Sequence, residues 1–356
     1  MKPSIQKCIQ ALRAGQPVLL TLRDDSGATR GALILAAENA TPAGVNLLAL
    51  EGRGVVCVGI DAATARRLDL SPMVQTADAA GAALHSVSTI SIDAKHGTTT
   101  GISAGDRAVT LRLLTSEEAT ADDFIRPGHL FPYVAHEHGV LGRAEMPEAA
   151  VDLMRLAGLK PAGAFCGVLD RSGRVADAAY LQDLASRQGI ATVGMDELVA
   201  HRLLHGRYLQ PGDKEPLASD YGTLEIQSVR DTVHDDTHHV VSKKPGPGQT
   251  GIVYVHRACI KEDVFGARDG AGRRNLAAAL RRLAAEGGLV IYLGPRTPAE
   301  RGPSIAAQLV ALSGLRAVRP VGPDAAGLPA LLEQVGVSAA AACGEGAVKE
   351  AIAIHR

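Results

Sequence analysis

Four short runs of apolar residues place the strongest constraint on how the first 200 residues can fold. They are PVLLTL at 17–22, GALILAA at 31–37, GVVCVGI at 54–60 and GAFCGVL at 163–169. Runs of this length, bounded by glycine or charged residues, are typical of buried strands. Amphipathic segments lie among them, and in 4–15 the side chains of Ile5, Cys8, Ile9 and Leu12 share one helical face. Strands and helices mix without strict alternation, which predicts an α+β fold with packed α/β layers.

Composition and length indicate two domains with cores of small and branched aliphatic residues. The chain has 356 residues, 3% aromatic residues and no tryptophan, and this length is about that of two ordinary domains. The polar segment YLQPGDKEPLASD at 208–220 contains two prolines and a glycine, so we expect a linker there. Domains are therefore predicted at 1–207 and 221–356, and the second contains further strands and a long helix near 275–285.

Charge and cysteine usage limit the classes of partner. The net charge of -1 argues against nucleic acid or a membrane surface bound through bulk charge. No run of about 18 apolar residues is present, so we expect no membrane span. The five cysteines are scattered without metal-ligand spacing, and no signal peptide is evident at the start. These features predict a cytoplasmic protein.

The segment HGTTTGISAGDR at 96–107 has the composition of an anion-binding loop. Ser103 and Asp106 have the spacing of a capping box, which places a hydroxyl-rich loop at the start of a helix. Free backbone N–H groups and the helix dipole favour an anion at such a position, and Arg107 supplies positive charge. The alternative is a glycine-rich connection with an ordinary helix cap.

Several polar clusters have both a chemical and a simpler interpretation. In RPGHLFP at 126–132, a turn could present His129 as a general acid or base and Arg126 to an anion, although most histidines in turns are only solvated. Asp24 and Asp25 could bind a metal ion or form a hairpin turn. AHEH at 135–138 is a weak metal signal, and DDTHH at 235–239 most simply predicts a solvated turn.

Taken together, five stretches resemble 3,4-dihydroxy-2-butanone 4-phosphate synthase over about residues 5–205. They are HGTTTGISAGDRAVTLRLL, ADDFIRPGHLFP, GVLGR, EAAVDLMRLAGLKPAGAFC and ATVGMDELVAHR. The second domain is similar to GTP cyclohydrolase II through VYVHRACIKEDVFGAR at 253–268. The resemblance implies a synthase-like α/β sandwich followed by a shortened cyclohydrolase-like domain, as in the fused enzymes of riboflavin biosynthesis. It also implies a homodimer.

The resemblance assigns roles to residues that match the synthase family, which converts ribulose 5-phosphate into a four-carbon phosphate and formate with magnesium. His129 and Cys166 take catalytic positions, and Glu148 also matches. The expected substrate-binding residues are Thr98, Thr99, Thr100, Ser103, Asp106, Arg107, Arg126 and Arg143.

Other family positions carry different residues. Ala28 and Met146 replace the two magnesium ligands, and Gly167 replaces an essential glutamate. Neither alanine nor a thioether is a suitable ligand for Mg²⁺. Arg30 and Glu145 introduce charges at former active-site positions, so both are candidates for altered roles together with Asp24 and Asp25. We therefore expect no metal cofactor, unless Asp24, Asp25 or Glu145 replaces the missing magnesium ligands.

The second domain departs from the cyclohydrolase pattern at its zinc site. Cys259 matches the first zinc ligand, but Gly270 and Gly272 stand at the other two positions. Because a zinc site needs at least three protein ligands, neither zinc nor GTP cyclohydrolase activity is expected.

Three functions remain open at this point. The favoured one is a repurposed enzyme that acts on a phosphorylated, sugar-like or other small anionic metabolite. The second is a genuine 3,4-dihydroxy-2-butanone 4-phosphate synthase with displaced ligands. The third is a non-catalytic partner or regulator.

Overall fold

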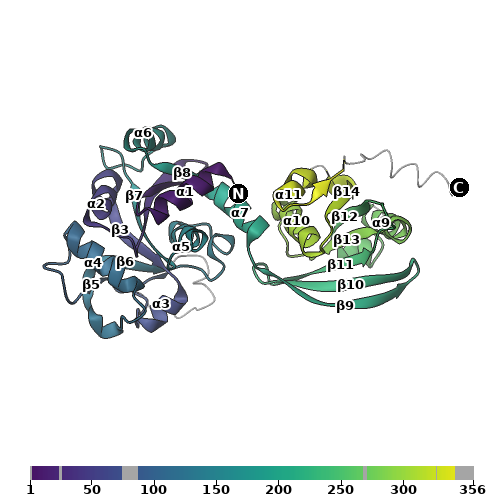
Figure 1. Cartoon of the computed structure of the whole chain (residues 1–356), viewed down its shortest axis with the longest axis horizontal. Coiled ribbons are helices and arrows are strands. Elements are labelled where there is room, and N and C mark those ends of the chain that lie inside the picture. The colour runs from purple at the N-terminus through teal and green to yellow at the C-terminus, as the bar shows by residue number, and fades with distance from the viewer. Residues whose placement is uncertain (1, 24–25, 74–86, 268–270, 326, 341–356) are drawn as a thin grey trace. The chain divides into compact units, whose positions relative to one another are not determined.

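The computed structural model describes residues 2–23, 26–73, 87–267, 271–325 and 327–340. The chain divides into two compact units, Met1–Val199 and Ala200–Arg356. Each unit contains a mixed β-sheet with associated helices (Figure 1). Two units that combine a mixed sheet with helices are therefore present, as the sequence predicts.

The sheet of the first unit follows the strand order β4-β6-β3-β7-β2-β1-β8, with β5 paired to β6. The strands are β1 Val18–Arg23, β2 Thr29–Ala36, β3 Arg53–Ile60, β4 Val87–Ser88, β5 Ile92–Ala94, β6 Phe124–Val134, β7 Ala162–Val168 and β8 Ala191–Gly194. All four apolar runs form strands, β1, β2, β3 and β7. The sheet is mixed, because β1 pairs antiparallel with β2 and parallel with β8.

Helices cover both faces of this sheet, and the alternation of side chains along each strand divides the core into two. In β2, Leu33 and Leu35 join one apolar cluster, whereas Ile34 and Ala36 join the other. The first cluster includes residues of α4 and α6, and the second includes residues of α1 and α5. The helices are α1 Pro3–Arg13, α2 Pro42–Leu47, α3 Ala62–Arg67, α4 Ala104–Thr115, α5 Met146–Ala157, α6 Ala178–Gln188 and α7 Met195–His205, with short helical turns η1 Leu48–Gly52, η3 Ala121–Asp123 and η4 Gly139–Leu141.

Side-chain caps determine where the helices of the first unit begin. Ser103 Oγ accepts a hydrogen bond of 3.0 Å from the backbone N of Asp106, so α4 begins directly after the hydroxyl-rich loop, as the sequence predicts. Thr41, Asp61 and Asp177 cap α2, α3 and α6 in the same way.

The second unit is built on a sheet with the order β15-β14-β12-β13-β11-β10-β9. Its strands are β9 Leu209–Ser219, β10 Gly222–Asp231, β11 Asp236–Lys243, β12 Gly251–Arg257, β13 Gly288–Leu293, β14 Ala317–Val321 and β15 Ser338–Ala339. Its helices are α8 Ile260–Asp263, α9 Gly272–Glu286, α10 Gly302–Leu312 and α11 Leu328–Gln334, with turns η5 Ala299–Arg301 and η6 Pro323–Ala325. Ala279 and Leu283 of α9 pack on Ile252, Tyr254 and Val290 of the sheet.

Most of the segment 208–220, predicted to be a linker, forms strand β9, Leu209–Ser219. This strand pairs antiparallel with β10 over most of its length, with a bulge between Gln227 and Val229 of β10. The strand lies at the edge of the sheet, and most of its residues are exposed. Because exposed positions favour polar residues, its composition is similar to that of a linker. Pro211 and Pro216 fit because an edge strand needs backbone donors on one side only.

The segment RPGHLFP, predicted to be a turn, lies within strand β6. Arg126 and Pro127 are joined by a cis peptide bond, and the register between β5 and β6 shifts nearby. His129 therefore projects from an irregular part of a strand.

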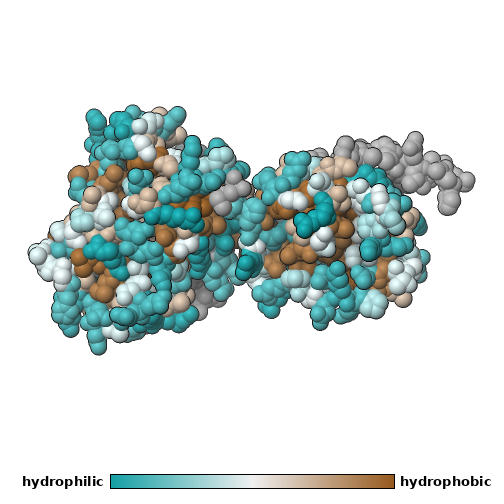
Figure 2. Space-filling model, viewed as in Figure 1, coloured by the Kyte–Doolittle hydropathy of each residue, from teal (hydrophilic) through white to brown (hydrophobic). Residues whose placement is uncertain are grey.

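Within the part of the chain that the structure describes, no helix is long and apolar enough to span a membrane. Figure 2 shows mostly hydrophilic residues on the visible face of each unit. Smaller apolar patches are scattered among these hydrophilic residues.

Candidate functional site

An aspartate in β5 fixes the orientation of His129. Asp93 Oδ2 lies 2.7 Å from His129 Nδ1, and Asp93 Oδ1 accepts a hydrogen bond of 2.9 Å from the backbone N of His129. The carboxylate has 8% of its side chain exposed, but the imidazole has 43% exposed. Because a carboxylate only accepts, this contact assigns the Nδ1 proton to the Asp93 hydrogen bond, and in the neutral imidazole the lone pair is then on Nε2. Such an imidazole can act as a general base.

The threonine-rich loop is held together by Asp106 at the start of α4. The Asp106 carboxylate accepts hydrogen bonds from Thr99 Oγ1 at 2.8 Å and from the backbone N of Gly101 at 3.0 Å. The Thr99 hydrogen bond is the main cause that holds the pKa of Asp106 below its ordinary value. Thr98 donates to the carbonyl of Ala94. In this structure Thr98, Thr99, Ser103 and Asp106 thus shape the loop by bonding to one another or to backbone.

Gly101 brings this loop against the Asp93–His129 pair. Its φ is +87°, and a Cβ at this position would lie 2.1 Å from Asp93 Oδ2 and 2.8 Å from His129 Nδ1. Only glycine allows this approach without strain or displacement. The structure therefore brings the two stretches singled out in the sequence, TTTGIS and RPGH, into one site.

Arg107 follows Asp106 on α4 and is partly buried. Its Nε is buried and has no hydrogen-bond partner among the described residues. Buried arginines are normally paired with an acid or hydrogen-bonded. Arg107 therefore has unused capacity to bind an anion.

Cys166 lies on β7, and the positive charge of Arg107 acts on its thiol group. Burial raises the pKa of the Cys166 thiol to about 11, although a backbone hydrogen bond from Gly54 and the charge of Arg107 both oppose the rise. The side chain is fully buried. Cys166, predicted as catalytic, is therefore a neutral thiol at pH 7, whereas nucleophilic cysteines react as thiolates.

Two of the predicted substrate-binding arginines make structural contacts. Arg143 Nε donates to Oε1 of Glu148 at 2.9 Å, and this glutamate is fully buried and also accepts from the backbone N of His136. Arg126 Nη2 donates to the carbonyl of Leu68 at 2.6 Å. Arg143 therefore helps to neutralise a buried carboxylate, and Arg126 ties β6 to the end of α3. For Thr100 no side-chain hydrogen bond is present among the described residues.

Arg30 and Glu145, the two charges introduced at former active-site positions, form an ion pair. Arg30 Nη2 lies 3.3 Å from Glu145 Oε2 and 3.4 Å from Oε1. The pair joins the beginning of β2 to the residue that precedes α5. In the sheet, strands β7 and β3 separate β2 from β6, which amounts to about 14 Å at about 4.8 Å per strand. Asp24 and Asp25 lie outside the described residues.

Open space lies at Gly167, on the strand next to β2. A Cβ built on Gly167 would have no atom within 4 Å among the described residues. Gly167 pairs with Ala32 in the register of β7 and β2, and Arg30 lies two residues before Ala32. Side chains two residues apart on a strand point to the same face, so Arg30 and this open space share one face of the sheet.

The second unit contains a buried aspartate that bonds two histidines. Asp231 Oδ2 lies 2.6 Å from His234 Nδ1 and 3.3 Å from His238 Nε2. His234 Nε2 is in turn 3.2 Å from Nη1 of Arg301, which can only donate. Asp231 and His238 are fully buried. This cluster has its hydrogen-bonding groups occupied from within the unit.

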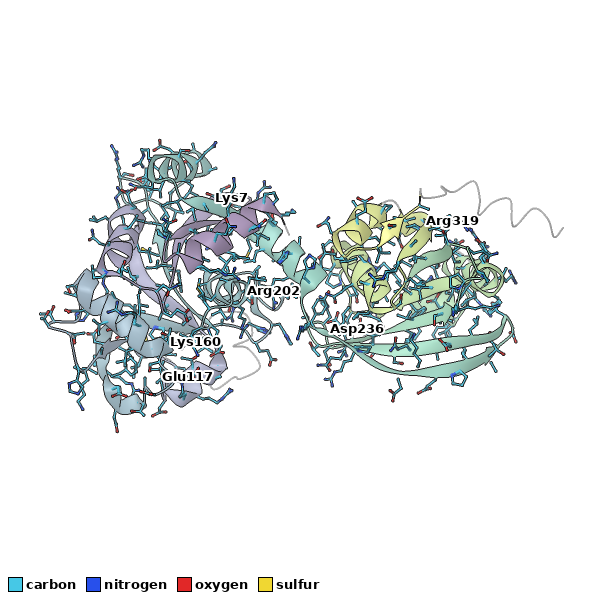
Figure 3. The ribbon with its side chains drawn as sticks, viewed as in Figure 1. Lys7, Glu117, Lys160, Arg202, Asp236 and Arg319 are labelled. Carbon is cyan, nitrogen blue, oxygen red and sulfur yellow. The ribbon has the colours of Figure 1, made fainter. Side chains whose placement is uncertain are left out.

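The solvated turn predicted at DDTHH is wrong, because Asp236 and His238 are buried. Asp236, labelled in Figure 3, accepts hydrogen bonds of 2.9 Å from the backbone N atoms of Thr237 and Arg296. His238 Nδ1 accepts from the backbone N of Gly294 at 3.1 Å. These side chains connect β11 to the segment that follows β13.

Near Cys259, the carboxylate of Asp263 is the shared partner of several polar groups. Asp263 accepts from the Tyr292 hydroxyl at 2.8 Å and the Cys259 backbone N at 2.9 Å, and it lies 2.9 Å from His256 Nε2. Burial opposes ionisation of Asp263, but these hydrogen bonds outweigh it and lower the pKa. Within the described ranges, no group of three or more histidine, cysteine or acidic side chains could hold a metal ion.

Sequence reasoning missed Asp93, the residue that orients His129. It lies at the end of the alternating stretch VSTISID, where a single acidic residue follows buried positions. An acid on the buried side of a short strand is the signal that could have identified it, because such a group needs a partner.

Comparison with known protein families also divides the chain into two parts. The profile of the 3,4-dihydroxy-2-butanone 4-phosphate synthase family matches residues 6–201, and that of GTP cyclohydrolase II matches residues 212–339. The fold and the matched segments thus define a two-domain α/β protein of the riboflavin-pathway type.

Two curated relatives and two solved structures make the relationship more specific. The chain is 34% identical over 291 residues to the riboflavin biosynthesis protein RibBA of Staphylococcus saprophyticus, covering 82% of this chain and 72% of the relative. It is 36% identical over 301 residues to RibBA of Mycobacterium tuberculosis, covering 82% and 69%.

Among solved structures, RibBX, described as a two-domain 3,4-dihydroxy-2-butanone 4-phosphate synthase from A. baumannii, matches with a TM-score of 0.71 at 25% identity, covering 95% of this chain and 99% of that one. The synthase of Candida albicans matches at 35% identity and a TM-score of 0.50, covering 55% of this chain and 96% of that one. The chain belongs to the family of riboflavin biosynthesis proteins in which a 3,4-dihydroxy-2-butanone 4-phosphate synthase domain is fused to a GTP cyclohydrolase II domain.

Proposed function

We propose that the first unit is an enzyme that binds a phosphorylated, sugar-like metabolite and transfers protons through His129, without the magnesium and zinc sites of its family. The single observation that carries this proposal is the Asp93–His129 pair beside Gly101 of the threonine-rich loop. Asp93 fixes the Nδ1 proton, so Nε2 is left to accept a proton from a bound substrate.

The anion is assigned to the region of the loop and Arg107. Arg107 brings a buried Nε donor without a partner among the described residues, and a phosphate group offers several strong acceptors. The free N–H groups at the beginning of α4 add favourable partial charge for the same anion. Arg143 is not needed for this role, since its guanidinium bonds the buried Glu148. Arg126 has a buried Nε without a partner among the described residues, as Arg107 has, but its Nη2 is held by the carbonyl of Leu68.

The second candidate function is the synthase reaction itself, with ribulose 5-phosphate as substrate and formate as one product. The similarity to RibBA proteins over 82% of the chain favours it. GTP cyclohydrolase activity is not proposed for the second unit, because glycines stand at two zinc-ligand positions. We further propose that the protein works in the cytoplasm as a homodimer.

The test combines binding and turnover of ribulose 5-phosphate by the full-length chain. Isothermal titration in EDTA and in Mg²⁺ measures affinity, and formate release measures the synthase reaction. We expect binding that Arg107→Ala weakens by about tenfold or more. Arg66→Ala, which removes an exposed arginine from α3, is the matched control and should bind like the parent.

The titration and the formate assay separate the candidate functions. Binding without formate supports a changed reaction, whereas formate release that His129→Gln abolishes supports the synthase. If neither ribulose 5-phosphate nor other sugar phosphates bind, the proposed site is wrong and a non-catalytic role gains support.

A further inference from the structure

The ion pair between Arg30 and Glu145 lies where two segments with lost metal ligands meet. Ala28 is two residues before Arg30, and Met146 directly follows Glu145; these two residues replace the family's magnesium ligands. The contact between Arg30 Nη2 and Glu145 Oε2, at 3.3 Å, joins the same two segments in space. Thus the structure places a guanidinium between the two segments to which the resemblance assigns the magnesium ligands.

The side chains at this location do not fit a magnesium ion. Ala28 offers no side-chain ligand and Met146 offers a soft thioether, whereas Mg²⁺ requires oxygen ligands. Glu145 is already engaged by Arg30, whose positive charge repels a divalent cation. Within the described residues, moreover, no acidic or histidine cluster could serve as a replacement site.

Arg30 retains hydrogen-bonding capacity beyond its contact with Glu145. Among the described residues only its Nη2 is hydrogen-bonded, and its Nε is buried without a partner. Arg30, Ala32 and Gly167 share one face of the sheet, and a Cβ at Gly167 would meet no atom within 4 Å among the described residues, which leaves room for a larger side chain. A guanidinium placed in this way can donate two parallel N–H groups to adjacent oxygens.

We propose that Arg30, positioned by Glu145, binds two adjacent oxygen atoms of the substrate in place of a divalent metal ion. This inference rests on the proposed function and adds a second cationic contact to it, on a different strand from His129. The guanidinium supplies fixed positive charge without metal coordination, and Glu145 acts only through Arg30.

The alternative is an ordinary surface ion pair with no ligand. The two side chains are 34% and 42% exposed, and exposed pairs contribute little to stability. An ordinary pair predicts that Arg30→Ala changes neither ligand affinity nor metal binding. The following experiment separates these alternatives with two readouts besides activity.

The first readout is Mn²⁺ binding to the EDTA-treated full-length protein, measured from the electron paramagnetic resonance signal of free Mn²⁺. We expect the parent protein to bind no Mn²⁺ at this site. The triple variant Ala28→Glu, Arg30→Glu, Met146→His should gain one site, with affinity at least about tenfold above that of the parent. Its matched control, with glutamine at all three positions, should not. Binding of one Mn²⁺ by the parent that Glu145→Gln removes would overturn the inference.

The second readout is the affinity for ribulose 5-phosphate in EDTA. We expect Arg30→Ala to weaken binding by about tenfold or more, and Arg30→Lys or Glu145→Gln to weaken it less. Melting curves followed by circular dichroism check that each variant is folded. Unchanged affinity in folded Arg30→Ala overturns the inference. Binding that appears only with Mg²⁺ overturns it but leaves the proposed function intact, and no binding under either condition overturns both.

Discussion

The two units each contain an aspartate–histidine pair of almost the same local geometry, with opposite access to solvent. Asp93 and His129 are 2.7 Å apart, and Asp231 and His234 are 2.6 Å apart. In both pairs Oδ2 faces Nδ1 and Oδ1 accepts a backbone N–H. The His129 side chain is 43% exposed, whereas that of His234 is 8% exposed.

The difference lies in what meets the second imidazole nitrogen. Arg301 donates to His234 Nε2, but no hydrogen bond to His129 Nε2 is present among the described residues. The same pair can therefore support proton transfer in one place and hold strands together in another. An aspartate–histidine contact alone does not identify a catalytic site; an exposed imidazole whose Nε2 has no hydrogen-bond partner among the described residues is the more informative feature.

The largest effect should come from removing the carboxylate of the closed pair. Asp231→Ala leaves two histidines without their shared acceptor, and we expect the second unit to lose about 3–5 kcal/mol of stability. Hydrogen exchange of the amides in β10 and β11, followed by mass spectrometry, measures this loss. Asp213→Ala, an exposed position on β9, is the matched control. Equal protection in both variants would show that the Asp231 cluster is not structural.

Acid should reproduce part of this effect. Burial opposes ionisation of Asp231, but hydrogen bonds from His234, His238 and the backbone outweigh it and lower its pKa. Because this pKa is lower in the folded than in the unfolded chain, the stabilisation is complete above about pH 4 and is lost as the pH falls further. Exchange protection of β10 and β11, corrected for intrinsic rates, should therefore decline below that pH. In the Asp231→Asn variant, the decline in protection should be smaller than in the parent protein. An identical decline would show that protonation of Asp231 is not its cause.

Removing the carboxylate of the open pair should affect stability less. Asp93→Ala is expected to destabilise the first unit by about 1–2 kcal/mol, because its histidine partner can turn to water. The rate of substrate turnover should fall by more than this small loss of stability can explain, since His129 would lose its fixed orientation. Urea unfolding and exchange in β5 and β6 measure the first effect. If Asp93→Ala destabilises as strongly as Asp231→Ala, access to solvent does not distinguish the two pairs.

The smallest effect is expected at Gly167. Gly167→Ala should change stability by no more than about 0.5–1 kcal/mol, because the added methyl group meets open space. Gly59→Ala is the contrasting variant, since its Cβ would lie 2.6 Å from the carbonyl oxygen of Pro147. We expect that variant to be destabilised by about 1–3 kcal/mol. Thermal melting compares the two, and equal losses would argue against an opening at Gly167.

The sequence predicts much of the fold because local signals dominate there. Continuous apolar runs mark the strands β1, β2, β3 and β7, and Ser103 marks the beginning of α4. Strand β9 escapes prediction because an edge strand that is exposed along most of its length lacks the apolar signal. The turn predicted at RPGHLFP fails because β6 tolerates Pro127 and Gly128 at an irregular position.

The site is less accessible to sequence reasoning because its partners are distant in the chain. His129 and the threonine-rich loop can be recognised as motifs, but Asp93 becomes visible only when β5 pairs with β6. Arg30 and Glu145 are 115 residues apart, so their complementary charges give no local pattern. Substitutions can be identified in a family pattern, whereas the contacts that replace the lost groups require the structure.

Strand β9 has a consequence for self-association. An unpaired edge of eleven residues offers about 36 Å of backbone to another chain, and such edges promote sheet growth. Pro211 and Pro216 cannot donate to an incoming strand, and the bulge in the pairing with β10 interrupts a regular register. The second unit can therefore display a long, polar hairpin at high protein concentration without providing a template for fibrous aggregation.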